Sequence, residues 1–164
     1  MSDRRYGFYI TILLVILLDQ ITKLIVVATV PLFDSVTIIP NFLDITYVRN
    51  TGLAYGLMND WDSKYKSLIT GTLAVAALGG ILLYARQMPA EEKWSRRGLA
   101  LILAGAIGNI LDRVRLGYVI DYVDVYWRGW HFWAFNVADA AISVGAVFVF
   151  AELLLGKRHA SRTV

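Results

Sequence analysis

Cysteine is absent from this chain of 164 residues, and histidine occurs only at His131 and His159. The absence of cysteine excludes disulfide frameworks, thiolate nucleophiles and cysteine-ligated zinc or iron–sulfur sites. Two histidines are too few for a histidine-rich metal cage, and the zinc-binding pattern H-E-x-x-H does not occur. The sequence therefore predicts no metal site.

Charged residues are also scarce, at 18% of the chain, whereas 57% of the residues are hydrophobic and the mean hydropathy is +0.55. Soluble domains average roughly 45–50% apolar and about 25% charged residues. A chain of this length buries only about 70% of its unfolded surface on folding, so it cannot hide this much apolar surface from water. The composition excludes a disordered chain and favours an integral membrane protein.

Four segments are apolar enough to cross a bilayer, which requires about 20 residues of helix. They cover about residues 8–28, 68–85, 98–113 and 134–155. Open sheet edges cannot be satisfied in lipid, so these segments are expected to be helices. The third segment is the weakest candidate for a membrane span, because its uncharged run before Asp112 is short. We expect one integral-membrane domain over residues 1–164, mainly α-helical, with outer loops at about 29–67 and 114–133.

Lysine and arginine are unevenly distributed between the two sides of the predicted spans. The two termini and the link around residues 86–97 hold nine of them in about 27 residues, whereas the other side holds six in about 62. Because cytoplasmic segments are enriched in Lys and Arg, both termini are expected to face the cytoplasm. This topology explains the pI of about 9.2 without a nucleic-acid partner.

The predicted outer side contains two stretches rich in β-branched and aromatic residues, Val36–Val48 and Tyr118–Trp127. Such composition, bounded by Pro, Asn and Gly, is typical of short strands, so we expect a small extracytoplasmic sheet. Aromatic residues near the predicted span ends fit an interfacial belt. They are Trp61, Tyr65, Trp127, Trp130 and Trp133.

Polar and ionisable residues gather near the outer ends of the predicted spans. Such residues are costly in a bilayer and usually face protein or water. Asp19 and Lys23 are spaced i, i+4 on one helical face, where a helix-locking ion pair is one interpretation. The third span places Gly105, Gly108, Asn109 and Asp112 on one face, followed by Arg113, and the fourth places Asn136, Asp139 and Ser143 on one face.

Asp121 and Asp139 raise the possibility of paired-carboxylate chemistry at the membrane surface. Two carboxyl groups in contact share a proton, so one can activate water while the other polarises a carbonyl. From the residues alone, two other interpretations stay open: structural polar contacts, and an ion relay through Asp19, Asp112 and Asp139 in a small ion-coupled transporter or channel subunit.

Five strings of the sequence resemble the lipoprotein signal peptidases, also called signal peptidase II, over nearly the whole chain. They are L-D-Q-I-T-K (18–23), R-N-T-G-L-A (49–54), G-A-I-G-N-I-L-D-R (105–113), G-Y-V-I-D (117–121) and F-N-V-A-D-A (135–140). The resemblance implies a multi-pass enzyme of the bacterial inner membrane, with four spans, a small extracytoplasmic sheet and an active site at the outer face. It also implies an aspartyl endopeptidase that needs no cofactor.

The implied activity is removal of the signal peptide from diacylglyceryl-modified prolipoproteins, cutting before the lipidated cysteine. Its partners are then the lipid-modified prolipoprotein and membrane phospholipid. Carried over residue by residue, the catalytic pair is Asp121 and Asp139, and a water activated by the pair attacks the peptide. The implied substrate-binding residues are Asp19, Asn50, Gly52, Asn109, Arg113 and Asn136, whereas Lys23 is assigned a structural role.

The sequence departs from the family pattern at Leu53, where the family usually has alanine, and this bulk is expected to reshape the pocket wall. A second nearby carboxylate, Asp124, makes the choice of Asp121 depend on the string alone. Arg113 is expected either to stabilise Asp112 or to bind a substrate carbonyl.

Overall fold

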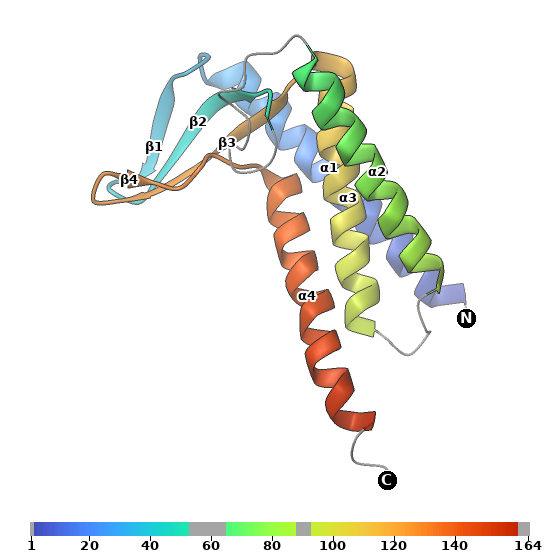
Figure 1. Cartoon of the computed structure of the whole chain (residues 1–164). Coiled ribbons are helices and arrows are strands. Elements are labelled where there is room, and N and C mark those ends of the chain that lie inside the picture. The colour runs from blue at the N-terminus through green and yellow to red at the C-terminus, as the bar shows by residue number, and fades with distance from the viewer. Residues whose placement is uncertain (1, 53–64, 88–92, 161–164) are drawn as a thin grey trace.

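The computed structural model describes residues 2–52, 65–87 and 93–160, so the expectations for Leu53 and Trp61 lie outside the described residues. The described part contains four helices and a small sheet (Figure 1). The helices are α1 (Ser2–Thr29), α2 (Lys66–Gln87), α3 (Lys93–Leu116) and α4 (Val137–Ala160). The strands are β1 (Ser35–Ile39), β2 (Leu43–Asn50), β3 (Val119–Trp127) and β4 (Trp130–His131).

Helix α3 is central and packs against the other three helices. Figure 1 shows the start of α1, the end of α2, the start of α3 and the end of α4 at one end of the helices, with the sheet at the opposite end. Two helical segments, Tyr6–Thr29 and Val137–Leu154, are long and apolar enough to cross a membrane. Helix α4 begins three residues later than the predicted span because Asn136 caps it, its Oδ1 accepting the backbone N–H of Asp139 at 2.9 Å.

The sheet is antiparallel, in the order β1-β2-β3-β4. The stretch over 36–48, expected to be strand-forming, belongs to two strands, β1 and β2, because the chain turns at Asn41, whose φ of 61° is a conformation that Asn tolerates. The strand expected over 118–127 is present as β3. A further strand, β4, follows a two-residue turn in which Arg128 and Gly129 both have positive φ, as a type I′ hairpin turn requires.

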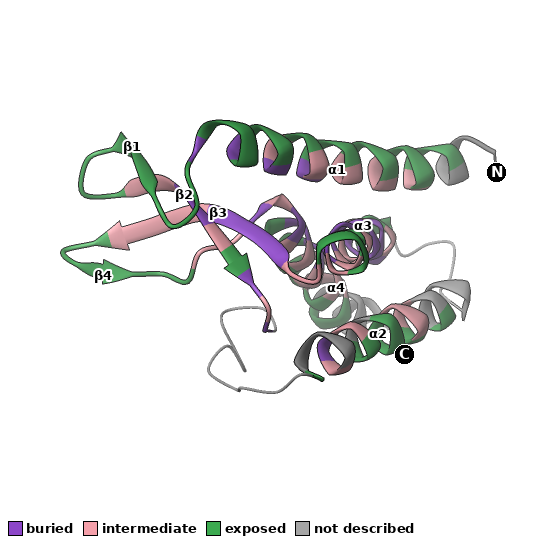
Figure 2. Cartoon of the chain, turned by 90° about the horizontal axis from the view of Figure 1, so that it is seen from above, coloured by how far each residue is buried: buried purple, intermediate pink, exposed green. Residues whose placement is uncertain are grey.

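Burial is inverted relative to a water-soluble protein. Asp19 and Lys23 are among the most buried side chains, whereas Leu14 of the same helix is 59% exposed and Phe150 of α4 is 65% exposed. Figure 2 shows the buried positions on β3 and on the faces that α1 and α3 turn toward each other, with exposed positions along the outer side of α1. Exposed side chains this apolar indicate that lipid surrounds the helices.

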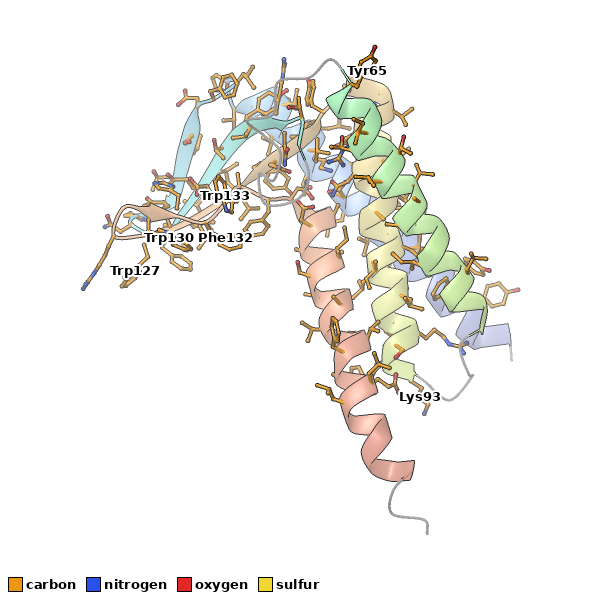
Figure 3. The ribbon with its side chains drawn as sticks, viewed as in Figure 1. Tyr65, Lys93, Trp127, Trp130, Phe132 and Trp133 are labelled. Carbon is orange, nitrogen blue, oxygen red and sulfur yellow. The ribbon has the colours of Figure 1, made fainter. Side chains whose placement is uncertain are left out.

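Aromatic side chains are exposed at the sheet end of the molecule. Trp127, Trp130 and Trp133 lie on and beside the β3–β4 hairpin, and Tyr65 lies at the start of α2 (Figure 3). Lys93, at the start of α3, lies at the opposite end of the helices. Trp94, next to Lys93, is also exposed, at 51%. Exposed aromatic side chains at both ends match the interfacial belts expected of a membrane protein.

Glycine allows α3 and α4 to approach closely. A Cβ atom added at Gly98 would lie 2.5 Å from the carbonyl oxygen of Gly145. A Cβ at Gly105 would collide with the carbonyl oxygen of Ala138, in the first turn of α4. Small residues at such crossings allow backbone-to-backbone packing between membrane helices.

Replacing Gly105 by alanine should therefore destabilise the protein by about 1–3 kcal/mol, because α3 must move away from α4. The matched control is Gly80→Ala in α2, where an added Cβ meets no atom within 4 Å. The control should be neutral or stabilising by up to about 1 kcal/mol, since alanine favours helix over glycine. Thermal unfolding of the detergent-solubilised variants measures both effects. Equal midpoints for the two variants would contradict the close-packing interpretation.

Candidate active site

Asp121 points away from α1 because of its place in β3. Side chains alternate between the two faces of a strand. Its neighbours Ile120 and Tyr122 pack in one cluster with Val26 and Val30 of α1, so the carboxyl group of Asp121 leaves the opposite face of the sheet. There it is 2% exposed.

Asp139 is placed by the first turn of α4. The capping is reciprocal, because the backbone N–H of Asn136 donates to Asp139 Oδ2 at 3.4 Å while Asn136 Oδ1 accepts from the N–H of Asp139. This is the capping-box arrangement, with an acid three residues after the capping residue. The local string N-V-A-D therefore both begins the helix and fixes the Asp139 carboxylate.

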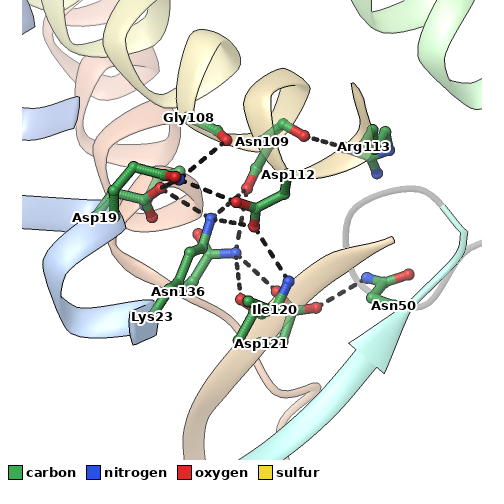
Figure 4. A network of polar contacts seen from close by, with 12 residues as sticks. Asp19, Lys23, Asn50, Gly108, Asn109, Asp112, Arg113, Ile120, Asp121 and Asn136 are labelled. Atoms are coloured by element: carbon green, nitrogen blue, oxygen red, sulfur yellow. Dashed lines mark hydrogen bonds and ion pairs between the residues drawn. The ribbon is translucent and has the colours of Figure 1, made fainter. Parts of the chain in front are cut away.

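Two asparagines bridge Asp121 and Asp139. Nδ2 of Asn136 donates to Asp121 Oδ1 at 2.7 Å, and Nδ2 of Asn109 donates to Asp139 Oδ1 at 2.8 Å. The asparagines also bond to each other, Asn136 Nδ2 to Asn109 Oδ1 at 3.2 Å. Figure 4 shows Asn109, Asn136 and Asp121 in this network. The two carboxyl groups, 18 residues apart in sequence, thus belong to one hydrogen-bonded cluster.

The end of β2 supplies a third amide. Nδ2 of Asn50 donates to Asp121 Oδ2 at 2.9 Å, and Oδ1 of Asn50 accepts the backbone N–H of Gly52 at 2.8 Å. Arg113 of α3 donates to the Gly52 carbonyl at 2.8 Å, and its guanidinium charge interacts with both Asp121 and Asp139. Asn50 and Gly52 are therefore held beside Asp121.

Burial of the carboxyl group, with the negative charge of Asp139 as the second cause, raises the pKa of Asp121 to about 7. Hydrogen bonds from Asn50 and Asn136 act in the opposite direction. Near neutral pH this acid therefore exchanges a proton readily. A site with one protonated and one ionised carboxyl group supports general acid–base catalysis on a carbonyl.

A buried ion cluster lies directly behind this pair. Lys23 Nζ contacts Asp19 Oδ2 at 2.9 Å, Asp112 Oδ2 at 2.8 Å and Asn109 Oδ1 at 3.2 Å (Figure 4). The ion pair predicted from the i, i+4 spacing of Asp19 and Lys23 is confirmed. Gly108 makes room for this cluster, since a Cβ there would lie 2.7 Å from Asp19 Oδ2.

The cluster is tied to the backbone of two other elements. Asp19 Oδ1 accepts the N–H of Ala138 at 3.0 Å, and Asp112 Oδ2 accepts the N–H of Ile120 at 3.2 Å. Ala138 precedes Asp139, and Ile120 precedes Asp121, in the sequence. The ion cluster therefore fixes the main chain beside each acid of the pair.

Seven of the eight site residues expected from the sequence lie together in this cluster. They are Asp121, Asp139, Asn50, Gly52, Asn109, Arg113 and Asn136. Asp19, the eighth, lies in the adjoining ion cluster: its carboxylate is 1% exposed and bonds to Lys23, Gln20 and Ala138. It is positioned to support the pair from behind.

Asp112 and Asp124 each have a partner outside the carboxyl pair. Asp112 pairs with Lys23, while Arg113 bonds to Gly52. The support role of Asp112 was missed, although its spacing of three residues from Asn109 on one helical face was a usable signal. Asp124 bonds to His131 Nδ1 at 2.8 Å.

Among the residues the structure describes, no group of three or more acidic or histidine side chains is arranged to hold a metal ion.

The chain is similar to known proteins over most of its length. The family profile described as signal peptidase (SPase) II matches residues 11–155. The lipoprotein signal peptidase of Geobacter metallireducens is 38% identical over 147 residues, covering 90% of each chain. That of Solibacter usitatus is 39% identical over 164 residues, covering 98% of each chain.

A solved structure of a bacterial membrane enzyme, obtained by the in meso method, matches with a TM-score of 0.75 at 29% identity. The match covers 96% of this chain and 92% of the other. Family profile, relatives and fold agree over nearly the full length. The chain therefore belongs to the signal peptidase II family, the lipoprotein signal peptidases.

Proposed function

We propose that this protein is an aspartic endopeptidase that removes the signal peptide from diacylglyceryl-modified bacterial prolipoproteins, cutting before the lipidated cysteine. Membership of the signal peptidase II family makes it a protease. The observation that carries the aspartic mechanism is the pair of acids from β3 and α4, Asp121 and Asp139, joined through Asn136 and Asn109.

The proposed topology has four spans in a single domain of the inner membrane, over residues 1–164, with both termini in the cytoplasm. The apolar outer surface of the helices and the shared end of α1, α3 and α4 support it. The basic Lys93 end then faces the cytoplasm, and the sheet with its exposed tryptophans lies at the outer surface. This places the carboxyl pair at the outer face, where the peptide and lipid parts of the substrate meet.

In the proposed reaction, the ionised carboxylate of the pair takes a proton from water while the oxygen of that water attacks the carbonyl carbon preceding the lipidated cysteine. The protonated carboxyl group donates its proton to the carbonyl oxygen, which gives a neutral tetrahedral intermediate. As the intermediate collapses, the C–N bond breaks and the cysteine nitrogen takes a proton from the carboxyl group that water had protonated. At the same time, one hydroxyl group of the intermediate returns its proton to the other, ionised carboxylate as the new carboxyl group forms. One water is consumed, and the pair returns to its initial protonation state.

Neutral amides and one cation are proposed to hold the substrate backbone. Asn50, Asn109 and Asn136 surround the pair without adding charge, and Arg113 with Gly52 forms the adjacent wall. Asp19 contributes through Lys23 and Ala138 and not by contact with substrate. The substrate acyl chains remain among membrane phospholipids, and no cofactor or nucleic acid takes part.

An ion-coupled transporter or channel subunit is not favoured. A relay across the membrane needs ionisable groups at several depths. Asp19, Asp112, Asp121 and Asp139 instead belong to one connected cluster near the sheet, and the sequence of α2 contains no acidic residue.

Replacing either acid of the pair by asparagine should abolish cleavage while the protein stays folded. Asp121→Asn and Asp139→Asn each remove a group that carries the proton, and general acid–base groups contribute about 10²–10⁴-fold. A gel shift of a purified, lipidated prolipoprotein measures the rate. Asp124→Asn is the matched control on the same strand and should retain wild-type activity, because its carboxylate bonds to His131 outside the cluster. A fully active Asp139→Asn protein would disprove the mechanism.

Cleavage should weaken as the pH rises above about 7. Asp121 holds its proton below its raised pKa of about 7 and loses it above that value, so the pair then lacks its acid. kcat/KM should approach a tenfold decrease per pH unit on the alkaline side, measured with prelipidated substrate in fixed detergent. A flat profile between pH 6 and 9 would contradict the proton-sharing pair.

The same shift predicts a change in stability. The folded state binds the Asp121 proton more tightly than the unfolded chain, whose Asp pKa is about 3.9. The stabilisation from this proton is full below about pH 4 and is lost as the pH rises through 7. The unfolding temperature should therefore fall more between pH 5 and pH 8 for the wild type than for Asp121→Asn. An identical fall in unfolding temperature in both proteins would show that the pKa of Asp121 is not raised.

A further inference from the structure

A cavity of about 110 Å³ lies between the outer part of α1, the end of α3 and strand β3. Its walls include the apolar side chains of Leu24, Val27, Leu116 and Ile120. An engineered apolar cavity of roughly 150 Å³ is known to bind benzene, so a space of this size holds several methylene groups. The cavity is therefore suited to part of a hydrocarbon chain.

This cavity is separate from the carboxyl pair. Ile120 lines the cavity, whereas Asp121, the next residue of β3, belongs to the pair. Because neighbouring side chains of a strand leave opposite faces, the sheet separates the two sites. An occupant of the cavity is therefore not the scissile peptide.

The walls of the cavity open toward the surface that the helices present to lipid. Leu24 is 60% exposed, and Val27 and Leu116 are also exposed at about 40%. Leu24 and Val27 belong to the last two turns of α1, near the sheet. In the proposed topology this is the level of the outer leaflet, where acyl chains meet headgroups.

One guanidinium group lines this cavity and a second stacks on two of its wall residues, neither with a carboxylate partner among the described residues. Arg115 lines the cavity and donates to the neutral Oε1 of Gln20 at 3.3 Å. Arg49 stacks over the rings of Tyr118 and Tyr47, two aromatic wall residues, at 4.8 and 5.7 Å. Lys23, in contrast, is neutralised by Asp19 and Asp112. The charge that lacks an opposite partner beside the cavity, that of Arg115 and Arg49, is therefore positive.

We propose that this cavity is a binding site for one anionic phospholipid of the outer leaflet, such as phosphatidylglycerol. Part of an acyl chain fills the space beside Leu24 and Val27, and the headgroup phosphate binds Arg115 and Arg49. Guanidinium groups bind phosphate through two parallel hydrogen bonds, which gives geometric specificity as well as charge. The inference depends on the membrane topology of the proposed function but not on the cleavage chemistry.

The site has a direct structural connection to the catalytic cluster. Lys23 and Asp112 line the same cavity, and Lys23 also bonds to Asn109, which bonds to Asp139. An occupant of the cavity therefore contacts residues of the buried ion cluster that fixes the main chain beside each acid of the pair.

The test is native mass spectrometry of the full chain, delipidated in detergent and then titrated with phosphatidylglycerol or with phosphatidylcholine of the same acyl chains. The wild type should retain one phosphatidylglycerol and bind phosphatidylcholine at least several-fold more weakly. Arg115→Gln removes the headgroup contact, and Val27→Phe fills the space without changing charge. Each should lower phosphatidylglycerol retention several-fold. Arg128→Gln, which removes an exposed guanidinium on the β3–β4 hairpin, is the control and should bind as the wild type.

Retention by Arg115→Gln equal to that of the wild type would overturn the proposal. Equal binding of both lipids would show that the cavity does not recognise the headgroup. An equal loss of phosphatidylglycerol retention in Arg128→Gln would show non-specific charge attraction. Either result would also overturn the proposal. A cleavage assay on the same samples, in a fixed lipid, confirms that each variant is folded. It also separates this proposal from the peptidase assignment, since a wild-type protein that cleaves prolipoprotein but retains no phosphatidylglycerol would overturn only the lipid site.

Discussion

The buried ammonium group of Lys23 is the interaction on which the rest of the site depends. It lies between the carboxylates of Asp19 and Asp112, with the side chains of all three almost fully buried. A buried charge is tolerated only when it is paired and fully hydrogen-bonded. Meeting that requirement brings α1 against α3 and, through the N–H groups of Ala138 and Ile120, fixes the backbone that carries Asp139 and Asp121.

The groups in direct contact with the two acids are mainly amides, and the lack of a full charge on these amides affects the pKa of Asp121. Asn50 and Asn136 hydrogen-bond Asp121 without a full positive charge, so burial dominates and its pKa stays near 7. A lysine in direct contact would favour the ionised form and lower that pKa. Lys23 is instead separated from Asp139 by Asn109. The arrangement stabilises the position of the pair while leaving a proton available to it.

The Asp19–Lys23 ion pair could be predicted from local spacing, whereas the members of the carboxyl pair and their neighbours were proposed from strings that resemble the family. Asp19 with Lys23 shows helical spacing, and N-V-A-D contains a helix cap together with one acid of the pair. What joins these patterns could not be predicted, because contact between Asp121 and Asn50 depends on strand register and contact between Lys23 and Asp112 depends on helix packing. The position of the turn within residues 36–48 was not predicted, because β-rich residues lie on both sides of Asn41.

The most direct test of this account replaces Lys23 by methionine, which keeps the length of the side chain and removes the charge. Lys93→Met, at the exposed start of α3, is the control. Removing one partner of a buried ion cluster costs roughly 3–5 kcal/mol. The account predicts that Lys23→Met lowers both the unfolding temperature and the cleavage rate on lipidated prolipoprotein, while Lys93→Met changes neither. A Lys23→Met protein as stable and as active as the wild type would contradict it.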